Sequence, residues 1–321
     1  MGPPAVRGVR ADAGRLAPDA LREALGIRSL AVHVSVLVDE VAFLLRPRDG
    51  GWVIDGTVGM GGHAEAMLEW SGEDVRLLGL DADPEALRRA GDRLARFGDR
   101  ARLAHASFAD LGAVAAEHGI SEARAVLLDL GVSSWQLEAS GRGFSFQGDE
   151  PLDMRLDPTR GEPAAILLNR LPEVELSRIL HEYGEERFAR RIARSIVHRR
   201  PLATTADLVA AVRAAVPRAA WPRRLHVATR TFQAVRMAVN DEPGALRRAL
   251  DDGPRLLARG GRLGVIAFHS GEDRIVKRTF RSLEAAGFAA LEPSPLEPGD
   301  DEVRANPRAR SAKLRVLERL P

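Results

Sequence analysis

The feature that most constrains the fold is a short apolar run that leads straight into a glycine-rich segment. The run Trp52-Val53-Ile54 predicts a β-strand, and Asp55-Gly56-Thr57-Val58-Gly59-Met60-Gly61-Gly62-His63 follows it. Glycine lets the main chain turn sharply and approach a ligand where a Cβ would clash. The stretch from Ala64 to Leu68 can then begin a helix whose first N–H groups face a ligand. This order of elements predicts a nucleoside pocket.

A second apolar run supports the same pocket because it ends on an acid. Leu77-Leu78-Gly79-Leu80 is followed by Asp81, and a carboxylate about twenty residues after such a turn suits two ribose hydroxyls. The spacing G-x-x-G-x-G-G differs from the dinucleotide fingerprint G-x-G-x-x-G, and no Gly-Lys-Ser/Thr is present for a triphosphate. The pattern favours an S-adenosylmethionine site over NAD or ATP. The alternative is a turn that only closes a strand-to-helix corner.

The first part of the chain alternates between strand and helix. The expected strands are Trp52–Asp55, Arg76–Asp81, Ala101–His105 and Ala125–Asp129, and the expected helices between them are Ala64–Trp70, Pro84–Phe97 and Leu111–His118. Pro84 suits the first turn of its helix, where a missing N–H costs nothing. Strands joined by helical crossovers imply a parallel sheet and an α/β fold.

The alternation stops after Leu130 and resumes near Pro243. The stretch between is predicted to be helical, at Ala164–Asn169, Glu173–Tyr183, Glu186–Val197 and Ala206–Ala215. Beyond it we expect a helix from about Pro243 to Ala258 that ends at Gly260-Gly261, a strand Arg262–Phe268, a helix Glu272–Ala286, and strands Phe288–Leu291 and Ala312–Leu317. The predicted domains are an extension of residues 1–32, a domain of residues 33–137 and 238–321, and an inserted helical domain of residues 138–237.

Composition excludes several classes of protein. The 321 residues include no cysteine, so disulfides, thiolate nucleophiles and zinc–thiolate sites are absent, and no H-E-x-x-H spacing suggests a metal. No run of apolar residues is long enough to predict a membrane span. Residues 1–30 lack the apolar stretch of a signal peptide, so the expected location is cytoplasmic.

A series of motifs in a fixed order carries a resemblance to a known family. They are His33-Val34-Ser35-Val36-Leu37-Val38-Asp39-Glu40, Asp55-Gly56-Thr57 with Gly61-Gly62-His63, Leu128-Asp129-Leu130-Gly131-Val132-Ser133-Ser134, Arg142-Gly143-Phe144-Ser145-Phe146, Pro151-Leu152-Asp153-Met154-Arg155, Tyr183-Gly184-Glu185-Glu186-Arg187-Phe188, Thr229-Arg230-Thr231-Phe232-Gln233-Ala234-Val235-Arg236, Phe268-His269-Ser270, Glu272-Asp273-Arg274-Ile275-Val276-Lys277 and Asn306-Pro307-Arg308-Ala309-Arg310. From His33 to about Val316 the chain resembles the bacterial ribosomal RNA small-subunit methyltransferase H family, also called MraW.

The resemblance implies a fold, an activity and partners. The implied fold is a class I, Rossmann-like S-adenosylmethionine-dependent methyltransferase sheet with an inserted, mainly helical domain. The implied reaction is methylation of the N4 amine of a decoding-site cytidine of 16S rRNA in the small ribosomal subunit, with no membrane involved. Whether the substrate is naked rRNA or an assembled subunit, and whether the chain forms a homodimer, stays open.

The resemblance also implies cofactor contacts at named positions. Gly61, Gly62 and His63 match the segment that holds the methionine moiety, Asp81 the ribose acceptor, Phe108 the adenine neighbour, and Asp129 and Gln136 the remaining contacts. The glycines and Asp81 follow from the residues alone as well, whereas Phe108, Asp129 and Gln136 come from the resemblance. Phe108 has the alternative of ordinary core packing. Gly271 stands where the family usually has leucine, and residues 1–30 match no family segment.

The predicted catalytic residue is Asp129. Cytosine N4 is a poor nucleophile, and an acceptor for its N–H, supplied by Asp129 or by nearby carbonyls, would help it. Many amino-methyltransferases carry Asp/Asn-Pro-Pro-aromatic at the end of the fourth strand, but this chain has Asp129-Leu130-Gly131-Val132. The aromatic side chain that stacks on the target base must therefore come from another part of the chain. Trp135, Phe144 and Phe146 are candidates, although each could equally be a core residue. His269 could line the same edge or be structural, and the general base is left unassigned.

Arginines of the insertion are the predicted RNA contacts. The candidates are Arg187, Arg190, Arg191, Arg194, Arg199, Arg200, Arg223, Arg224 and Arg230. Guanidinium groups pair with phosphates and stack on bases, although a solvated helix face balanced by Glu182, Glu185 and Glu186 is the alternative. Two rival functions remain, a small-molecule methyltransferase and an RNA-binding assembly protein with a vestigial pocket.

Overall fold

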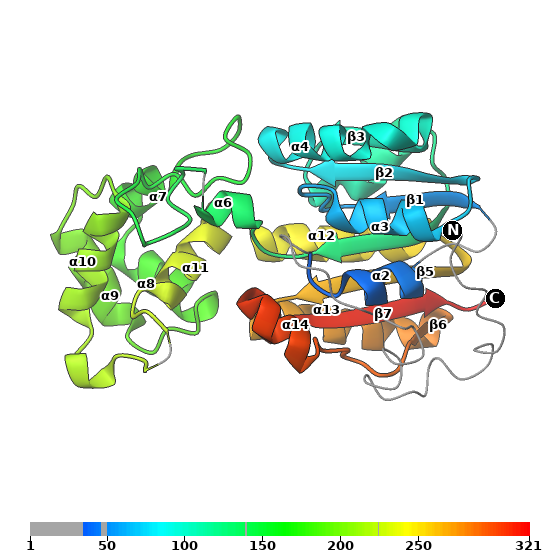
Figure 1. Cartoon of the computed structure of the whole chain (residues 1–321). Helices are drawn as coiled ribbons and strands as arrows, with labels where there is room; N and C mark the ends of the chain where they lie inside the picture. Colours follow the sequence, from blue (N-terminus) through cyan, green and yellow to red (C-terminus); the bar gives the residue numbers. More distant parts are fainter. Residues whose placement is uncertain (1–34, 46–49, 139, 224) are drawn as a thin grey trace. The chain divides into compact units, whose positions relative to one another are not determined.

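The computed structural model describes residues 35–45, 50–138, 140–223 and 225–321 (Figure 1). The chain divides into two compact units. The sheet unit comprises Met1–Gly131 and Leu246–Pro321, and the helical unit comprises Val132–Ala245. The insertion predicted from the sequence was residues 138–237. The predicted extension of residues 1–32 lies outside the described residues.

The sheet unit is built on seven strands in the order β3-β2-β1-β4-β5-β7-β6. Their bounds are β1 Gly51–Asp55, β2 Val75–Asp81, β3 Ala101–His105, β4 Ala123–Asp129, β5 Leu257–Ala267, β6 Phe288–Ala290 and β7 Lys313–Arg319. The pairs among β1 to β5 are parallel, while β7 runs antiparallel to both β5 and β6. The predicted α/β fold with a parallel sheet is therefore confirmed, and the sheet is mixed at its far edge.

The strand order reverses between β1 and β4, and this reversal locates the site. From β1 the chain goes outward to β2 and β3, and it then returns to place β4 on the other side of β1. In open α/β sheets a crevice for ligands forms at the carboxyl ends of the strands at such a switch point. Asp55 ends β1, Asp129 ends β4 and Asp81 ends β2. Three carboxylates therefore meet at one edge of the sheet.

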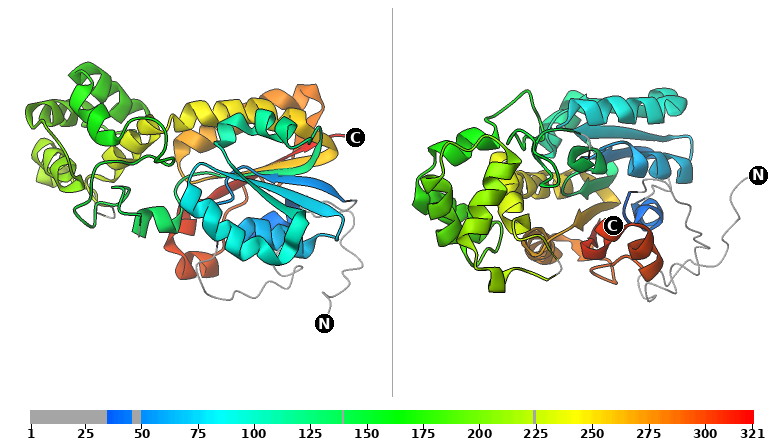
Figure 2. Two further views of the ribbon diagram at one scale, coloured as in Figure 1. Left: turned by 90° about the horizontal axis from the view of Figure 1, so that it is seen from above. Right: turned by 60° about the vertical axis from the view of Figure 1, so that its left-hand side comes forward.

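Helices cover both faces of this sheet (Figure 2). One face carries α2 Val38–Leu45, α3 Gly62–Trp70 and α4 Pro84–Leu94, and the other carries α5 Leu111–Glu117, α13 Ser270–Leu283 and the part of α12 Glu242–Leu256 from Leu246 onward. The strands supply alternate residues to the two cores, because successive strand side chains point to opposite faces. Val53 packs with the first core and Ile54 with the second.

Local sequence explains several of the helix ends. Pro84 occupies the first turn of α4, as predicted, and the Asp83 side chain accepts a hydrogen bond from the Glu85 N–H. The prediction that Gly260-Gly261 ends a helix was wrong. α12 ends at Leu256, and both glycines lie within β5, where the register against β4 shifts. Gly260 has φ +73°, which suits glycine, so the pair accommodates an irregularity in the strand.

The shorter elements complete the sheet unit. They are α14 Asp300–Ala305 and the 3₁₀ turns η1 Ala95–Arg100, η2 Phe108–Asp110, η4 Glu284–Ala286 and η5 Pro307–Ser311. The predicted helix Pro84–Phe97 therefore ends in a 3₁₀ turn, as does the predicted helix Glu272–Ala286. Among the residues described, no helix is long and apolar enough to cross a membrane.

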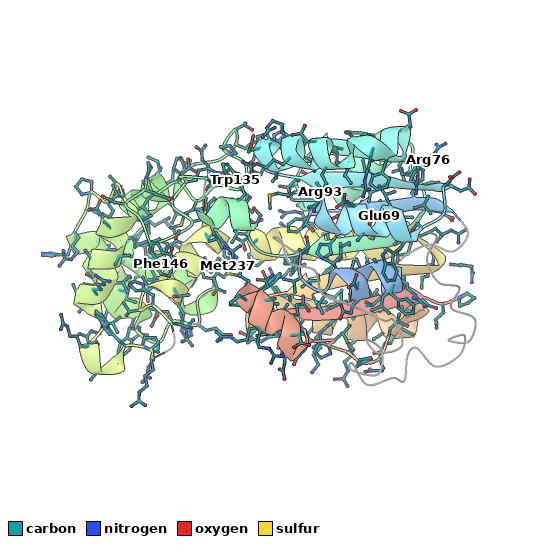
Figure 3. The ribbon with its side chains drawn as sticks, viewed as in Figure 1. Glu69, Arg76, Arg93, Trp135, Phe146 and Met237 are labelled. Carbon is teal, nitrogen blue, oxygen red and sulfur yellow. The ribbon has the colours of Figure 1, made fainter. Side chains whose placement is uncertain are left out.

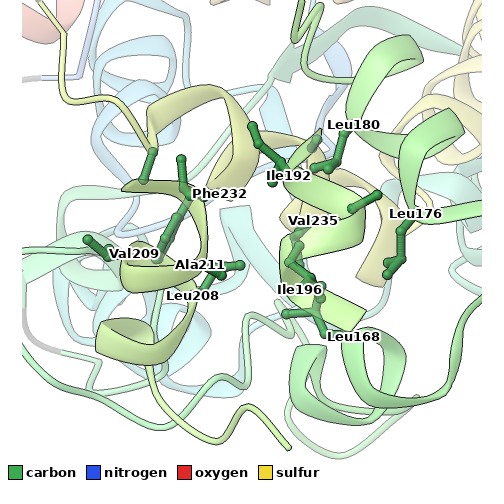
Figure 4. Close-up of a cluster of buried hydrophobic side chains, with 14 of the residues drawn as sticks. Leu168, Leu176, Leu180, Ile192, Ile196, Leu208, Val209, Ala211, Phe232 and Val235 are labelled. Atoms are coloured by element: carbon green, nitrogen blue, oxygen red, sulfur yellow. The ribbon is translucent and has the colours of Figure 1, made fainter. Parts of the chain in front are cut away.

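The helical unit has its own apolar core (Figure 4). Its helices are α6 Ser134–Glu138, α7 Ala164–Arg170, α8 Glu173–Glu182, α9 Ala189–His198, α10 Thr205–Ala215 and α11 Thr229–Val239, with the 3₁₀ turn η3 Arg218–Ala220. The four predicted helices of this region correspond to α7 to α10. Helix α11 was not predicted, although Phe232 and Val235 form an apolar pair three residues apart and are both buried.

Candidate functional site at the switch point

The glycine-rich turn is bonded to the strands on both sides of β1. The N–H of Gly56 donates to the Leu127 carbonyl of β4 at 2.9 Å, and the N–H of Val58 donates to the Leu80 carbonyl of β2 at 2.8 Å. A Cβ at Gly56 would stand 2.7 Å from Leu128 Cδ2, so the turn passes too close to β4 for any side chain. The turn is thereby held rigidly across the carboxyl ends of three strands.

Two further glycines allow the turn to enter α3. Gly61 is the N-cap residue with φ +83°, a left-handed conformation that glycine adopts at little cost. A Cβ on Gly62 would overlap Ser35 Oγ, because the segment before α2 lies directly against this position. Arg93 of α4, labelled in Figure 3, connects that helix to the turn and to α3. It donates to the Met60 carbonyl at 3.4 Å and to Glu65 Oε2 at 2.8 Å.

Asp81 is tied to the glycine-rich turn. Its Oδ2 accepts from the N–H of Gly59 at 2.8 Å, and its Oδ1 accepts from the N–H of Asp83 at 2.8 Å. Burial raises the pKa of Asp81 to about 6, although these two N–H donors act in the opposite direction. An ionised carboxylate offers about four acceptor positions, so each oxygen can still accept a further hydrogen bond, such as one from a hydroxyl.

Thr57 connects Asp55 to Asp129 through its hydroxyl group and its main-chain N–H. The N–H of Asp129 donates to Thr57 Oγ1 at 2.6 Å, and Asp55 Oδ1 accepts from the Thr57 N–H at 3.1 Å. One oxygen of each carboxyl group, Asp55 Oδ2 and Asp129 Oδ1, is buried without a hydrogen-bond partner among the residues that the structure describes. Leaving such an atom unsatisfied costs about 1–3 kcal/mol. Asp55, Thr57 and Asp129 thus form one corner of the site. Two unsatisfied oxygens in this corner are expected where a ligand completes the bonding.

His63 lies between these carboxyl groups and the segment before α2. Its Nε2 is 2.8 Å from the Val36 carbonyl, and its Nδ1 is 3.5 Å from Asp129 Oδ2. The side chain is 5% exposed, whereas that of Asp129 is 23% exposed. The imidazole of His63 therefore faces Asp129 and Val36, so the cofactor contact predicted for this segment is left to its main chain.

The electrostatics of the corner favour bound protons. Burial raises the pKa of Asp55 to about 7, with His63 and the Thr57 N–H opposing the shift, and burial together with the nearby Glu272 raises the pKa of Asp129 to about 8. Burial also lowers the pKa of His63, against the influence of Asp55. The corner thus holds more carboxyl groups than it has cations to balance them. A ligand that carries positive charge would stabilise their ionised forms.

The structure brings Phe108 to the same edge. This residue begins η2 after β3, and its Cβ is 3.3 Å from the position that a Cβ on Gly56 would take. Phe108 is partly buried and packs against the core on the α5 side of the sheet. It lies where an aromatic ring could contact a ligand above β1, and its predicted contact with adenine stays a prediction.

Gln136 and the candidate stacking aromatics belong to the helical unit. Gln136 is buried on α6, where its Oε1 accepts from the Ser133 N–H at 2.8 Å; its cofactor contact stays a prediction. Phe144 is 6% exposed within the core of this unit, so the core alternative holds for it. Phe146 stacks on His226 with ring centroids 4.5 Å apart. Trp135 is half-buried and remains a stacking candidate.

His269 is engaged at the start of α13. Its Nδ1 accepts from the N–H groups of Gly271 at 3.2 Å and Glu272 at 3.3 Å, and Glu272 Oε2 accepts in return from the N–H of His269 at 3.3 Å. This reciprocal arrangement is a capping box. The structural alternative for His269 is therefore the one that the geometry supports.

The arginines predicted to contact RNA differ in their surroundings. Arg190, Arg191 and Arg199 are exposed on or beside α9. Arg194 pairs with Glu173 at 3.4 Å, which is not one of the three glutamates expected to balance this face. Arg200 is a structural residue instead, because its guanidinium donates to the carbonyls of Leu168 and Leu171. Arg224 lies outside the described residues.

Two residues of the corner were not selected from the sequence as site residues. Asp55 and Thr57 appeared there only as members of a motif, yet Thr57 links β1 to β4 and Asp55 carries one of the two unsatisfied oxygens. The available signal was their position, because polar residues directly after a buried strand lie at the ligand-binding edge. Within the described ranges, no group of three or more histidine, aspartate or glutamate residues could hold a metal ion.

Comparison with known proteins places the chain in a family. A model of the MraW methylase family matches residues 30–320. The chain belongs to the MraW methylase family. Relatives named ribosomal RNA small subunit methyltransferase H include one from Geotalea daltonii, 50% identical over 308 residues that cover 90% of this chain and 98% of the relative. Another, from Syntrophotalea carbinolica, is 49% identical over 312 residues that cover 91% and 99%.

The MraW resemblance seen in the sequence is thus confirmed. A solved rRNA methylase from Streptococcus thermophilus is 15% identical, covers 92% of this chain and 100% of its own, and has a TM-score of 0.40. The MraW family model spans both units and therefore includes the strand ends that carry Asp55, Asp81 and Asp129.

Replacing Asp55 tests the electrostatics of the corner. Because the folded protein raises the pKa of Asp55 from 3.8 to about 7, the unfolded chain releases this proton more readily, and the free energy of unfolding falls as pH rises from about 4 to 7. Asp55→Asn keeps an acceptor for the Thr57 N–H and carries no charge. Its melting temperature relative to wild type should rise between pH 5 and pH 8, by about 3 °C or more.

The measurement is thermal unfolding followed by circular dichroism at pH 5, 6, 7 and 8. Asp99→Asn, which changes an exposed carboxylate of η1, is the matched control and should follow the wild-type pH dependence. A melting-temperature difference between Asp55→Asn and wild type that stays constant over this range would contradict the raised pKa.

Proposed function

We propose that the chain is an S-adenosylmethionine-dependent methyltransferase that methylates the N4 amine of a decoding-site cytidine in 16S rRNA of the small ribosomal subunit. The observation that carries the proposal is Asp129 Oδ1, a buried oxygen without a described partner at the end of β4, beside the glycine-rich turn of the switch point. Membership of the MraW family and the names of the relatives support the reaction and the substrate class. Its place of action would be the cytoplasm.

The residues of the corner fit a cationic nucleoside cofactor. Asp81 has acceptor positions for ribose hydroxyls, and the glycine-rich turn leads through Gly61 into the start of α3, where first-turn N–H groups can meet a ligand. Phe108 lies across Gly56 from β4, where an adenine would meet a flat apolar surface. When bound, S-adenosylmethionine supplies a methyl group on positively charged sulfur. That charge suits the buried carboxyl groups of Asp55 and Asp129.

The protein contributes orientation and a hydrogen-bond acceptor. The lone pair of the cytosine amine is delocalised into the ring, and an acceptor for an amine N–H increases the electron density on nitrogen. Asp129 Oδ1 is available for this role, and the bond from the Asp129 N–H to Thr57 fixes the main chain at that position. Holding an amine at near-attack distance supplies a large part of the acceleration in such reactions. The methylated amine can afterwards release its proton to water.

The helical unit is proposed to recognise the RNA. Arg190, Arg191 and Arg199 present exposed guanidinium groups on or next to α9, and arginine binds phosphates in a bidentate manner. A small-molecule methyltransferase would have no use for such a surface, which disfavours that rival. An assembly protein with a vestigial pocket would have no reason to keep two unsatisfied buried carboxyl oxygens at the switch point.

Transfer of labelled methyl groups tests the reaction. Purified protein with S-adenosylmethionine labelled in the methyl group should label 30S subunits or 16S rRNA that lack the modification. Nuclease digestion should then yield N4-methylcytidine. Asp129→Ala should lower the turnover number at least about 100-fold, because the amine loses its positioned acceptor. No label in RNA would contradict the proposed function, and near-normal turnover by Asp129→Ala would contradict the role of Asp129.

Charge reversal on α9 tests the RNA surface. Arg190→Glu combined with Arg194→Glu should weaken RNA binding and reduce the slope of log affinity against log salt, because fewer counterions are released. Affinity for S-adenosylmethionine should stay at its wild-type value. The same charge change at the exposed Arg76 and Arg259 of the sheet unit is the matched control. If both double variants bind RNA equally well at every salt concentration, α9 is not the RNA surface.

A further inference from the structure

We propose that His63 is a positioning residue for Asp129, and that the imidazole and the carboxyl group share one proton along the contact between Nδ1 and Oδ2. This sharing would leave Asp129 Oδ1 as a hydrogen-bond acceptor for the substrate amine. The inference rests on the proposed function only for its catalytic consequence. The shared proton itself is a property of the sheet unit and can be tested without RNA.

The Val36 carbonyl determines which ring nitrogen of His63 carries a proton. A carbonyl oxygen can only accept a hydrogen bond, and it is 2.8 Å from Nε2. Nε2 must therefore be protonated, so Nδ1 is the nitrogen that is free to carry either a lone pair or the second proton. Because Val36 lies in the segment before α2, the packing of that segment against α3 selects the tautomer.

The contact on the other side of the ring then needs a proton. Nδ1 and Asp129 Oδ2 are 3.5 Å apart, at the outer limit of a hydrogen bond. If His63 were neutral and Asp129 ionised, two lone pairs would face each other inside the protein. A single proton removes this repulsion, either as a carboxylic acid that donates to Nδ1 or as an imidazolium that donates to the carboxylate. In both forms Oδ1 carries no proton and can accept.

The surrounding groups favour retention of that proton. Asp55 interacts with both His63 and Asp129 from the end of β1, and Glu272 interacts with Asp129 from the start of α13. Both can carry negative charge, which opposes ionisation of Asp129 and favours a protonated partner beside it. The raised pKa of Asp129 and the lowered pKa of His63 agree in direction with a proton that resides mainly on the carboxyl group.

The arrangement also explains the burial of the side chain. His63 is the second residue of α3, where an exposed polar side chain would be expected, yet it is 4% exposed and turned toward β4. Its two nitrogens connect Val36 to Asp129, which are 93 positions apart in the sequence numbering. The ring therefore fixes the orientation of the Asp129 carboxyl group relative to the glycine-rich turn.

Two substitutions separate the two sides of the ring. His63→Gln places its amide group near the position of Nε2, so it can keep the hydrogen bond to the Val36 carbonyl but loses the contact with Asp129. His63→Asn places its amide group near the position of Nδ1, so it can donate to Asp129 but loses Val36. We expect His63→Gln to lower kcat at least tenfold and His63→Asn to retain several times more activity. The Kd for S-adenosylmethionine should change less than threefold in both variants.

The pH profile adds a readout that a purely structural role would not change. Wild-type kcat should depend on pH through the shared proton, whereas in His63→Asn only the Asp129 carboxyl group can titrate, so the pH at which kcat changes should shift. The positioning role would be overturned if His63→Gln and His63→Asn lowered kcat equally. It would also be overturned if activity fell only through a change in KM or in the Kd of the cofactor. Wild-type protein that transfers no methyl group would count against the proposed function instead.

Nitrogen NMR of the free protein tests the proton directly. The ring signals of His63, assigned by comparison with His63→Gln, should show protonated Nε2 at neutral pH and an Nδ1 in a hydrogen bond. Asp129→Ala should shift the Nδ1 signal toward that of an unbonded nitrogen. A ring protonated on Nδ1 and not on Nε2, or a His63 spectrum that is unchanged in Asp129→Ala, would overturn the shared proton whether or not the protein methylates RNA.

Discussion

The bond between the Asp129 N–H and Thr57 Oγ1, 2.6 Å long, is the contact on which the arrangement of the site depends. It joins the ends of β1 and β4 at the point where the strand order reverses. Parallel pairing aligns the carboxyl ends of these strands, and the hydroxyl group fixes their separation there. Asp55 and Asp129 consequently enter the same buried corner, and each keeps one oxygen without a described partner. Without this alignment, the carboxyl groups would lie on separate strand ends in water.

The glycine-rich turn and the segment before α2 both pack against that corner. The turn is bonded to Leu127 on one side and to Leu80 and Asp81 on the other, so it cannot move independently of the sheet. The Ser35 hydroxyl lies directly against Gly62, and the Val36 carbonyl is 2.8 Å from His63 Nε2, which favours a proton on that nitrogen. This cluster of carboxyl groups is held rigidly by the turn, carries excess negative charge when the groups ionise, and is suited to a cation whose position must be controlled.

Much of this could be predicted from the sequence because the signals are local. A few neighbouring residues are enough to recognise a strand followed by glycines, Pro84 at a helix start and Asp81 at a strand end. The contacts from His63 to Val36 and to Asp129 could not be predicted, since they depend on how distant segments pack. Gly260-Gly261 was misassigned because a glycine pair marks a strand irregularity as readily as a helix end. Arg200 was misassigned because composition cannot distinguish an arginine that binds carbonyls from one that faces solvent.

The central inference is that a cationic ligand ionises the buried Asp55 carboxyl group at the switch point, whose pKa burial raises to about 7. The most direct test is calorimetric titration of S-adenosylmethionine into the protein at pH 7 in buffers of different ionisation enthalpy, which counts the protons exchanged on binding. The pKa of about 7 for Asp55 predicts net release of protons, and the release should decrease in Asp55→Asn, whereas the proton shared by His63 and Asp129 should be retained. Binding with no proton exchange, or with uptake, would contradict the account.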